Sequence, residues 1–125
     1  MKTLNIPEGY QRVMPYLIIE NAPAFFEFTK NVFDAEEQYK AMRTETLIMH
    51  AEVNIGGSCI MFADATEQFN KHTAGMFIYV DDCDKVYKKA LDNGAVSIME
   101  PANQSYGRSA GVKDPFENTW WITSA

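Results

Sequence analysis

One structural unit occurs twice in this chain, and this internal repeat constrains the possible fold more than any other feature of the sequence. The segment 16–21 (YLIIEN) aligns with the segment 77–82 (FIYVDD), and both are aromatic and aliphatic runs that end in an acidic residue and a residue typical of helix N-caps. Apolar residues at helical spacing follow each run, over 22–33 and over 84–93. The sequence therefore predicts a strand followed by a helix, twice.

The rest of each copy predicts three further strands, of which the last two form a hairpin. Two adjacent glycines, typical of a tight turn, separate the strands of the first hairpin. In the second hairpin a longer turn occupies 114–118, and we expect Asn118 to take its left-handed position. The predicted strands are 37–43, 48–54 and 58–63 in the first copy and 95–99, 108–113 and 119–123 in the second.

Each copy is thus a β-α-β-β-β module, and the two modules form the single domain expected for 125 residues. Module one covers about 10–64 and module two about 75–124, with the polar segment 64–73 as their connection. A four-stranded sheet with one helix leaves its other face bare. Because two such modules can curl their sheets around a shared cleft, the predicted fold class is α+β, with a curved mixed sheet around that cleft.

The composition is that of an ordinary soluble globular domain, with 46% hydrophobic and 22% charged residues. Eleven Lys and Arg against seventeen Asp and Glu give a net charge of -6, which argues against a surface for nucleic acid. The sequence has no apolar run long enough to span a membrane and no basic leader before an apolar segment, so we expect a cytoplasmic protein without membrane contact. Cys59 and Cys83 are predicted to be reduced, buried thiols.

Several segments, taken together with the paired modules, resemble the vicinal oxygen chelate superfamily. These are 13–17 (VMPYL), 49–53 (MHAEV), 106–109 (YGRS) and 114–121 (DPFENTWW). The superfamily contains glyoxalase, bleomycin-resistance proteins and extradiol dioxygenases, and the likeness is strongest to its PhnB-like branch. The resemblance implies the two-module fold around a cleft and a homodimer, but it fixes no single activity, because this fold hosts unrelated chemistries and proteins that only sequester a ligand.

The resemblance also implies where a metal would bind. In metal-dependent members, four His or Glu ligands come from the first and last strands of each module. Those positions fall here on Met14, Met61, Gly75 and Trp121. None offers the carboxylate or imidazole donor that Mg, Mn, Ni or Zn requires, and a thioether is a soft ligand. We therefore expect no metal and no cofactor, with an unrecognised divalent metal site as the alternative.

Strand parity indicates which polar residues share the cleft with Met61. If the glycine pair forms a two-residue turn, Glu52 lies opposite Met61, Asn54 opposite Cys59, and His50 on the same face. In one hypothesis His50 is a general base or hydrogen-bond donor that Glu52 orients. The alternatives are a structural His-Glu pair on a partly solvated strand and a cryptic metal site.

The same parity argument predicts an apolar and aromatic lining with few polar groups, which is typical of a small-molecule pocket. A loop before the strand at 108–113 adds a phenol and a guanidinium that could close over an anionic ligand. Ordinary core packing is the alternative for the aromatic residues, and a solvated surface turn for the loop. The candidate ligand-binding residues are Met14, Tyr16, Cys59, Met61, Phe77, Tyr79, Tyr106, Arg108 and Trp121.

Three functions follow from these patterns. The first is a binding or sequestering protein that holds a small molecule, aromatic or cationic, in a metal-free cleft. The second is an enzyme, a lyase, isomerase or dioxygenase relative, that uses His50 and Glu52 or an unrecognised metal site. The third is a homodimeric interaction module with a collapsed cleft. Whether the protein is an enzyme stays open at this point.

Overall fold

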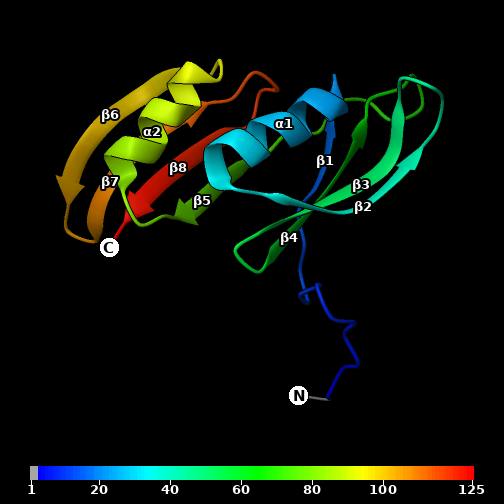
Figure 1. The fold of residues 1–125 in the computed structure, drawn as a ribbon, viewed down its shortest axis with the longest axis horizontal. Helices are drawn as coiled ribbons and strands as arrows, with labels where there is room; N and C mark the ends of the chain where they lie inside the picture. Colours follow the sequence, from blue (N-terminus) through cyan, green and yellow to red (C-terminus); the bar gives the residue numbers. More distant parts are fainter. Residues whose placement is uncertain (1–2) are drawn as a thin grey trace.

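The computed structural model describes residues 3–125 and contains the two predicted modules (Figure 1). Module one consists of β1 (Tyr16–Ile19), α1 (Ala22–Phe33), β2 (Glu36–Met42), β3 (Ile48–Ile55) and β4 (Ser58–Asp64). Module two consists of β5 (Gly75–Tyr79), α2 (Cys83–Asp92), β6 (Val96–Gln104), β7 (Gly107–Lys113) and β8 (Thr119–Ser124).

Both modules form a mixed four-stranded sheet with the same topology. The strand orders are β1-β4-β3-β2 and β5-β8-β7-β6, and in each sheet the first strand pairs in parallel with the last while the other pairs are antiparallel. The α+β fold of two β-α-β-β-β modules is thereby confirmed. Neither α1, with 12 residues, nor α2, with 10, is long enough to cross a bilayer, and no other helix within residues 3–125 qualifies.

The first hairpin has the predicted register. Gly56 and Gly57 both have left-handed φ angles, +55° and +101°, which glycine adopts without steric cost. The strands consequently pair so that Glu52 lies opposite Met61 and Asn54 opposite Cys59. The parity argument for the face that carries Glu52 is therefore confirmed.

Two local details differ from the sequence-based expectation. Strand β6 continues through Pro101 to Gln104, beyond the predicted end at residue 99, because β6 is an edge strand with an irregular register where a proline is tolerated. The left-handed residue of the 114–118 turn is Glu117, with φ +72°, and not Asn118. Asn118 is instead fully buried, and its side chain donates to Asp114 and accepts from the N–H of Ala74.

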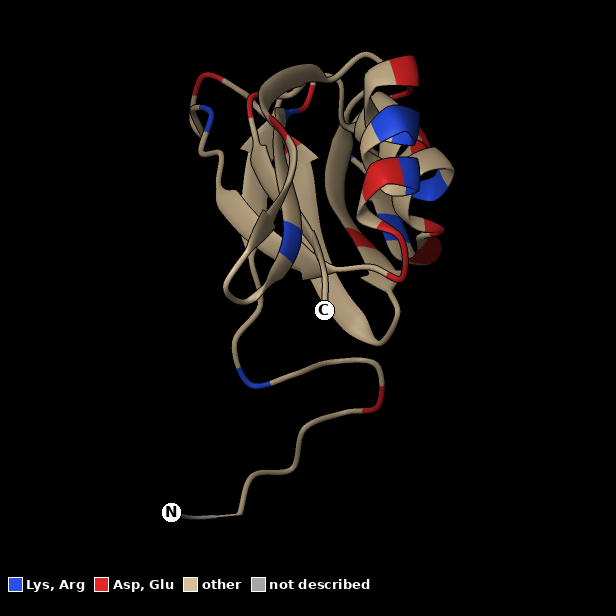
Figure 2. Cartoon of the chain, turned by 90° about the vertical axis from the view of Figure 1, so that its left-hand side faces the viewer, with Lys and Arg blue, Asp and Glu red and all other residues tan. Residues whose placement is uncertain are grey.

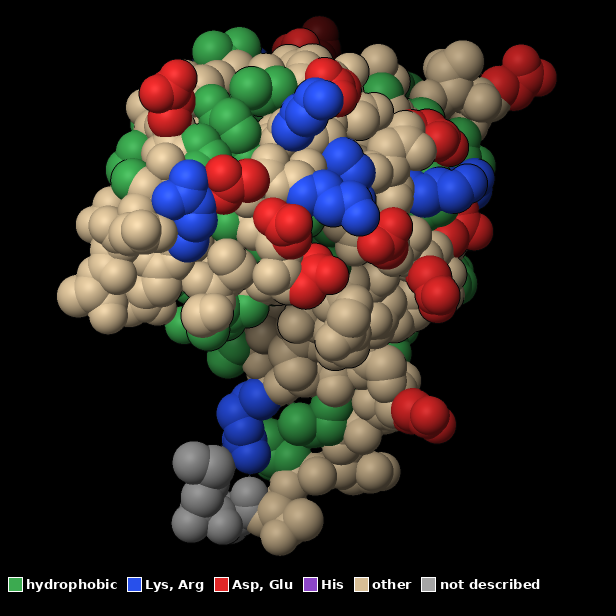
Figure 3. Space-filling model, turned by 60° about the vertical axis from the view of Figure 1, so that its left-hand side comes forward, with side chains coloured by type: hydrophobic (Ala, Val, Ile, Leu, Met, Phe, Trp, Pro, Cys, Tyr) green, Lys and Arg blue, Asp and Glu red, His purple; other side chains and the backbone are tan. Residues whose placement is uncertain are grey.

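The modules share one hydrophobic core, since α1 packs against α2 as well as against its own sheet. Phe33 of α1 lies 4.5 Å, between ring centroids, from Trp120 of β8, and Phe25 lies 5.5 Å from Phe116 in an edge-to-face contact. Both cysteines are free and buried, as predicted. Figure 2 shows acidic and basic residues side by side on the helices, and Figure 3 shows both signs intermixed on the molecular surface in that view.

The first N–H of each helix donates to a polar side chain from the last strand of its own module, and α2 has in addition its own side-chain cap, Asp82. Asp64, buried at the end of β4, accepts hydrogen bonds from the N–H groups of Ala22 (2.8 Å) and Ile48 (2.7 Å). At the corresponding place in module two, the N–H of Cys83 donates to the Ser124 hydroxyl at 3.4 Å. Asn21, the N-cap residue of α1, has a left-handed conformation and its side chain accepts no hydrogen bond from the helix. Asp64 therefore supplies the acceptor for the first N–H of α1.

We predict that Asp64→Asn destabilises the protein by about 2 kcal/mol, because one buried N–H would face an amide donor in place of a carboxylate oxygen. The change in the free energy of unfolding is measured by urea denaturation. Ser124→Ala is the matched control at the equivalent position, and its long hydrogen bond predicts a loss below about 1 kcal/mol. Equal losses for both variants would contradict the role given to Asp64.

Candidate functional site

The predicted site residues divide between the two sheets. Each sheet has one face turned to its helix and the core, and one face without a helix, which we call the open face. Tyr16, Glu52 and Met61 lie at one level on the open face of the first sheet, because Tyr16 and Glu52 both pair with Met61 in register. On β8, Trp120 is buried in the core, so the neighbouring Trp121 projects to the open face of the second sheet. Between the two open faces, no hydrogen bond or aromatic contact joins the described site residues.

A chain of hydrogen bonds crosses the open face of the first sheet. The Tyr16 hydroxyl lies 2.9 Å from His50 Nδ1, and His50 Nε2 lies 2.8 Å from Glu52 Oε2. The Tyr10 hydroxyl donates to Glu52 Oε1 at 2.6 Å. We call these four residues the polar chain. Within the polar chain the Glu52 side chain is buried, with 5% of it exposed, whereas Tyr16 at one end is 46% exposed.

Two residues of this network, Tyr10 and Gln38, could not be predicted from the sequence to contact Glu52. Tyr10 precedes the first strand and reaches Glu52 only because 9–11 cross the open face: the Gly9 carbonyl accepts from Gln38, and the Gln11 side chain bonds both backbone groups of Cys59. Gln38 donates to Glu52 Oε1 at 3.3 Å, yet it sits where the β2–β3 register shifts, so strand parity could not assign its face.

Glu52 is charged in this setting. Burial acts to raise its pKa, but the hydrogen bonds from Tyr10, His50 and Gln38 outweigh burial and leave the pKa below its ordinary value. The hydrogen bond to Glu52 in turn raises the pKa of the Tyr10 hydroxyl. Cys59 lies beneath the 9–11 segment, and burial raises the pKa of its thiol, so it is not an activated nucleophile.

The open face of the second sheet is aromatic. Phe77 lies 5.3 Å from Tyr79 and 6.2 Å from Tyr106, between ring centroids, and all three side chains are about half exposed or more. Trp121 lies across Gly111 of β7, where its ring leaves no room for a Cβ atom. This explains the glycine in the middle of a strand.

Arg108 does not join these aromatic residues. Its guanidinium forms two hydrogen bonds with Asp84 of α2, at 2.5 and 3.0 Å, and a third with Asn103 at 3.1 Å. Arg108 therefore lies on the helix side of the sheet, and the expectation that it closes over a ligand beside Tyr106 is corrected. The physical reason is that the loop places the two residues on opposite faces and Asp84 neutralises the arginine.

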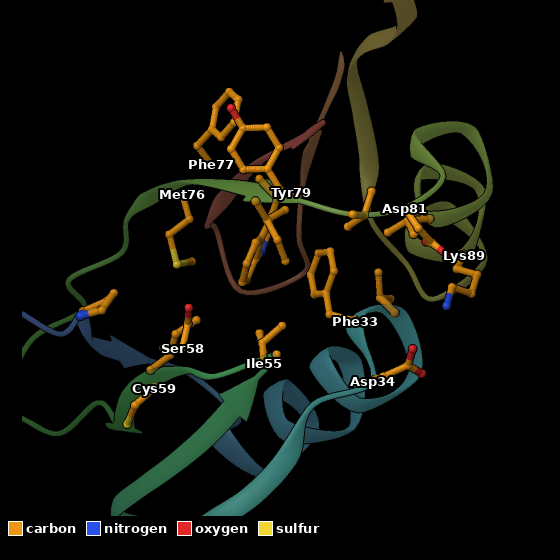
Figure 4. Close-up of a pocket in the computed structure, with 18 of the residues that line it drawn as sticks. Phe33, Asp34, Ile55, Ser58, Cys59, Met76, Phe77, Tyr79, Asp81 and Lys89 are labelled. Carbon is orange, nitrogen blue, oxygen red and sulfur yellow. The ribbon is translucent and has the colours of Figure 1, made fainter. Parts of the chain in front are cut away.

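A pocket of about 690 Å³ lies where the modules meet, and we call it the junction pocket (Figure 4). It includes three predicted residues, Cys59, Phe77 and Tyr79, but Figure 4 shows the Phe77 and Tyr79 rings on the far side of β5 from Met76. The interior is instead formed by apolar residues of the helix side, which the sequence analysis did not assign to a site. These include Val32, Phe33, Ile55, Met76, Ile78, Val86 and Trp120.

The family positions for a metal do not fit one. Met61 and Trp121 lie on the open faces, Gly75 has no side chain, and half-buried Met14 precedes β1 by two residues. Within residues 3–125 no group of three or more His, Cys, Asp and Glu side chains is placed to hold a metal ion. Thioether and indole groups are poor ligands for hard divalent cations, so these four positions do not form a site for one.

The charge of Glu52 predicts a pH dependence of stability. Because its folded pKa lies below the ordinary 4.5, its contribution is fully present above that pH and is lost as the pH falls through the folded value. The difference in free energy of unfolding between wild type and Glu52→Gln should therefore shrink between about pH 5 and pH 3. Urea denaturation at each pH measures this difference in free energy. Glu36→Gln, which changes an exposed carboxylate on β2, is the control. A difference between wild type and Glu52→Gln that stays constant with pH would contradict the lowered pKa of Glu52.

The sequence of the chain matches one family over most of its length. The family is the Glyoxalase/Bleomycin resistance protein/Dioxygenase superfamily, and the match covers residues 10–122. A search by sequence among curated proteins gave no match.

Solved structures agree with this assignment. A gene product from Arabidopsis thaliana superposes with a TM-score of 0.75 at 22% identity, covering 91% of this chain and 98% of that one. The PhnB protein from Bacillus cereus gives 0.72 at 18% identity, covering 92% and 100%. The fosfomycin resistance protein FosX from Mesorhizobium loti gives 0.68 at 15% identity, covering 90% of each chain. At these identities the likeness shows the fold alone, and together with the family match it establishes that the chain belongs to the Glyoxalase/Bleomycin resistance protein/Dioxygenase superfamily.

Proposed function

We propose that this protein binds a small, flat, largely apolar molecule in the junction pocket. The observation that carries the proposal is the pocket itself, because its volume of about 690 Å³ lies within the range of ligand sites and its lining combines apolar and aromatic side chains with polar and charged ones. Trp120 and Phe33, which pack on each other and are buried, form the base of the pocket, and half-buried Met76 offers a side chain that adapts to the shape of a ligand. The family name includes resistance proteins, and a protein that only holds a compound in a pocket needs no catalytic group.

Charged groups at the end of the junction pocket beside α2 would orient the ligand. Asp34, Asp81, Lys85 and Lys89 line this pocket, and none of them forms an ion pair within the described part of the chain. An apolar interior with a few free charges gives a ligand both affinity and orientation. The net charge of -6 favours a neutral or cationic ligand over an anionic one.

We also propose that the protein is a homodimer of the PhnB-like branch. The exposed aromatic residues support the first point, since Phe77, Tyr79 and Tyr106 leave apolar surface on the second open face that a partner chain could cover. The likeness to the Bacillus cereus PhnB protein supports the second point.

We predict that planar aromatic compounds, neutral and cationic, bind in the junction pocket and shift the NMR signals of the Met76 methyl group and the Trp120 indole. Ser58→Trp, at the mouth of the pocket, should weaken this binding at least about tenfold by filling the entrance. Ser105→Trp, at an exposed serine in the turn between β6 and β7 that does not line the pocket, is the matched control and should bind like the wild type. If the compounds bind Ser58→Trp and wild type equally, the ligand does not occupy this pocket.

The polar chain favours a second candidate function, proton transfer to or from a ligand on the first open face. With neutral His50, Nε2–H donates to Glu52, which leaves Nδ1 as the acceptor that faces Tyr16. A carboxylate that fixes one ring nitrogen and so directs the other is the arrangement of a general base. Reactions of the lyase or isomerase class need such a base.

We predict that, if this second function holds, the protein exchanges the α-protons of small 2-oxo acids or aldehydes for deuterium in D₂O, which ¹H NMR measures. His50→Gln and Glu52→Gln should each slow the exchange by about 100-fold. His72→Gln is the matched control, because His72 is the other histidine of the chain and lies outside the polar chain. Exchange that is equal in all variants, or no exchange above buffer, would leave ligand binding as the function.

A further inference from the structure

The two helices cover their sheets unequally. Helix α2 packs over β6, β7 and β8, whereas α1 packs over β3 and β4 and makes few contacts with the edge strand β2. A helix is about 10 Å wide, and four strands at about 4.8 Å spacing make a wider sheet, so one helix cannot cover the whole face. The uncovered part of the first sheet lies on the helix side, beside β2 (Figure 1).

One pair of equivalent residues shows this difference. In module two, Tyr87 of α2 reaches the edge strand β6, where its hydroxyl donates to Ser97 at 2.7 Å. The equivalent residue in module one is Phe26, which has no polar group with which to bond β2 and stays half-buried at the side of α1. The repeat therefore closes this side of module two but leaves it open in module one.

The opening is an apolar pocket of about 610 Å³, which we call the side pocket. It lies on the opposite face of the first sheet from the polar chain, and its lining comes from α1, β2, β3, β4 and the loop before β3. Its apolar lining residues include Ala24, Phe26, Met42, Ile48, Ala51 and Phe62.

The charges of the side pocket are mainly negative. Its charged lining residues are Glu27, Glu37, Glu45 and Glu52, against one cation, Lys40. The carboxylate of Glu52 is held by His50 and Tyr10 in the polar chain. Lys40 pairs with Glu37 at 3.6 Å, so Glu27 and Glu45 are the carboxylates that form no ion pair within residues 3–125. We propose that the side pocket is a second ligand site, separate from the junction pocket, that takes a small lipophilic cation with an aromatic or aliphatic body and an ammonium group.

A cation fits this surface better than a second copy of the chain. In a symmetric dimer the same patch faces itself, so this contact would bring Glu27 and Glu45 of one copy towards the same carboxylates of the other. Like charges at such an interface oppose association. A ligand with an ammonium group beside the carboxylates and its apolar body against Phe26 and Met42 satisfies both features of the pocket.

The test uses 1-naphthylmethylammonium on the full-length protein, followed by the NMR signals of the Met42 and Ile48 methyl groups. Neutral 1-naphthylmethanol and anionic 1-naphthoate have the same ring and are the charge controls. We expect the cation to bind about fivefold or more tightly than the alcohol at low salt, and the naphthoate to bind least. The preference should fall as salt is raised, because the carboxylates are exposed.

Three variants locate the site. The double variant Glu27→Gln, Glu45→Gln should weaken the cation about threefold or more and leave the alcohol unchanged, while Glu36→Gln, a nearby carboxylate that does not line the pocket, changes neither. Ala24→Leu fills part of the pocket without disturbing helix propensity and should weaken both ligands. Ser58→Trp, which fills the mouth of the junction pocket, should change neither.

The proposal is overturned by any of three results. The first is that 1-naphthylmethylammonium at millimolar concentration does not shift the Met42 and Ile48 signals. The second is that the alcohol binds as tightly as the cation, which would make this a non-selective apolar surface. The third is that Ala24→Leu or the double variant changes the oligomeric state in sedimentation, which would make the surface an interface between copies. None of these results depends on whether the junction pocket binds its ligand.

Discussion

Each module has a single helix, and that helix packs both against its own sheet and against the helix of the other module. The rest of the structure depends on this double contact. Because α1 and α2 pack against each other, Phe33 reaches Trp120 and Phe25 reaches Phe116, so the two modules have one core between them. No helix is left for the second face of either sheet. Both open faces, the junction pocket and the side pocket follow from this shortage of covering elements.

The two modules share a topology but not a chemistry. The open face of module one carries a charged and hydrogen-bonded chain that ends at Tyr16, whereas that of module two carries packed aromatic rings. Equivalent positions make the contrast specific. Asp64 and Ser124 each accept a hydrogen bond from the first N–H of a helix, but the Asp64 carboxylate binds a second N–H as well. Phe26 leaves open a side of module one that Tyr87 closes in module two. Differences at single equivalent positions thus give the two repeated modules different surfaces.

The features that could be predicted from the sequence are those that depend on a repeat or on strand periodicity. The repeat predicted both modules, and the glycine turn predicted the register that places Glu52 beside Met61. The sequence did not predict contacts between segments that neither the repeat nor the strand periodicity places together. Tyr10 reaches Glu52 from outside the sheet, Gln38 sits at a register shift, and Arg108 turns to Asp84 on the helix. The junction pocket was missed for the same reason, because its interior comes from the packing of the modules rather than from one strand face.

The family resemblance implies a metal ligand at the position of Met61, and the neighbours of this residue show how poorly the position suits a cation. Tyr16 and Glu52 flank Met61 on the two adjacent strands, so polar groups do lie beside the inherited ligand position. Both oxygens of Glu52 are already engaged, one by Tyr10 and Gln38 and the other by His50. A cation at this place would have to break those bonds and would gain only a thioether in return. The hydrogen bonds of Glu52 therefore fix the orientation of His50, whose other ring nitrogen lies beside Tyr16, and the ligand sites proposed above lie elsewhere, in the two pockets.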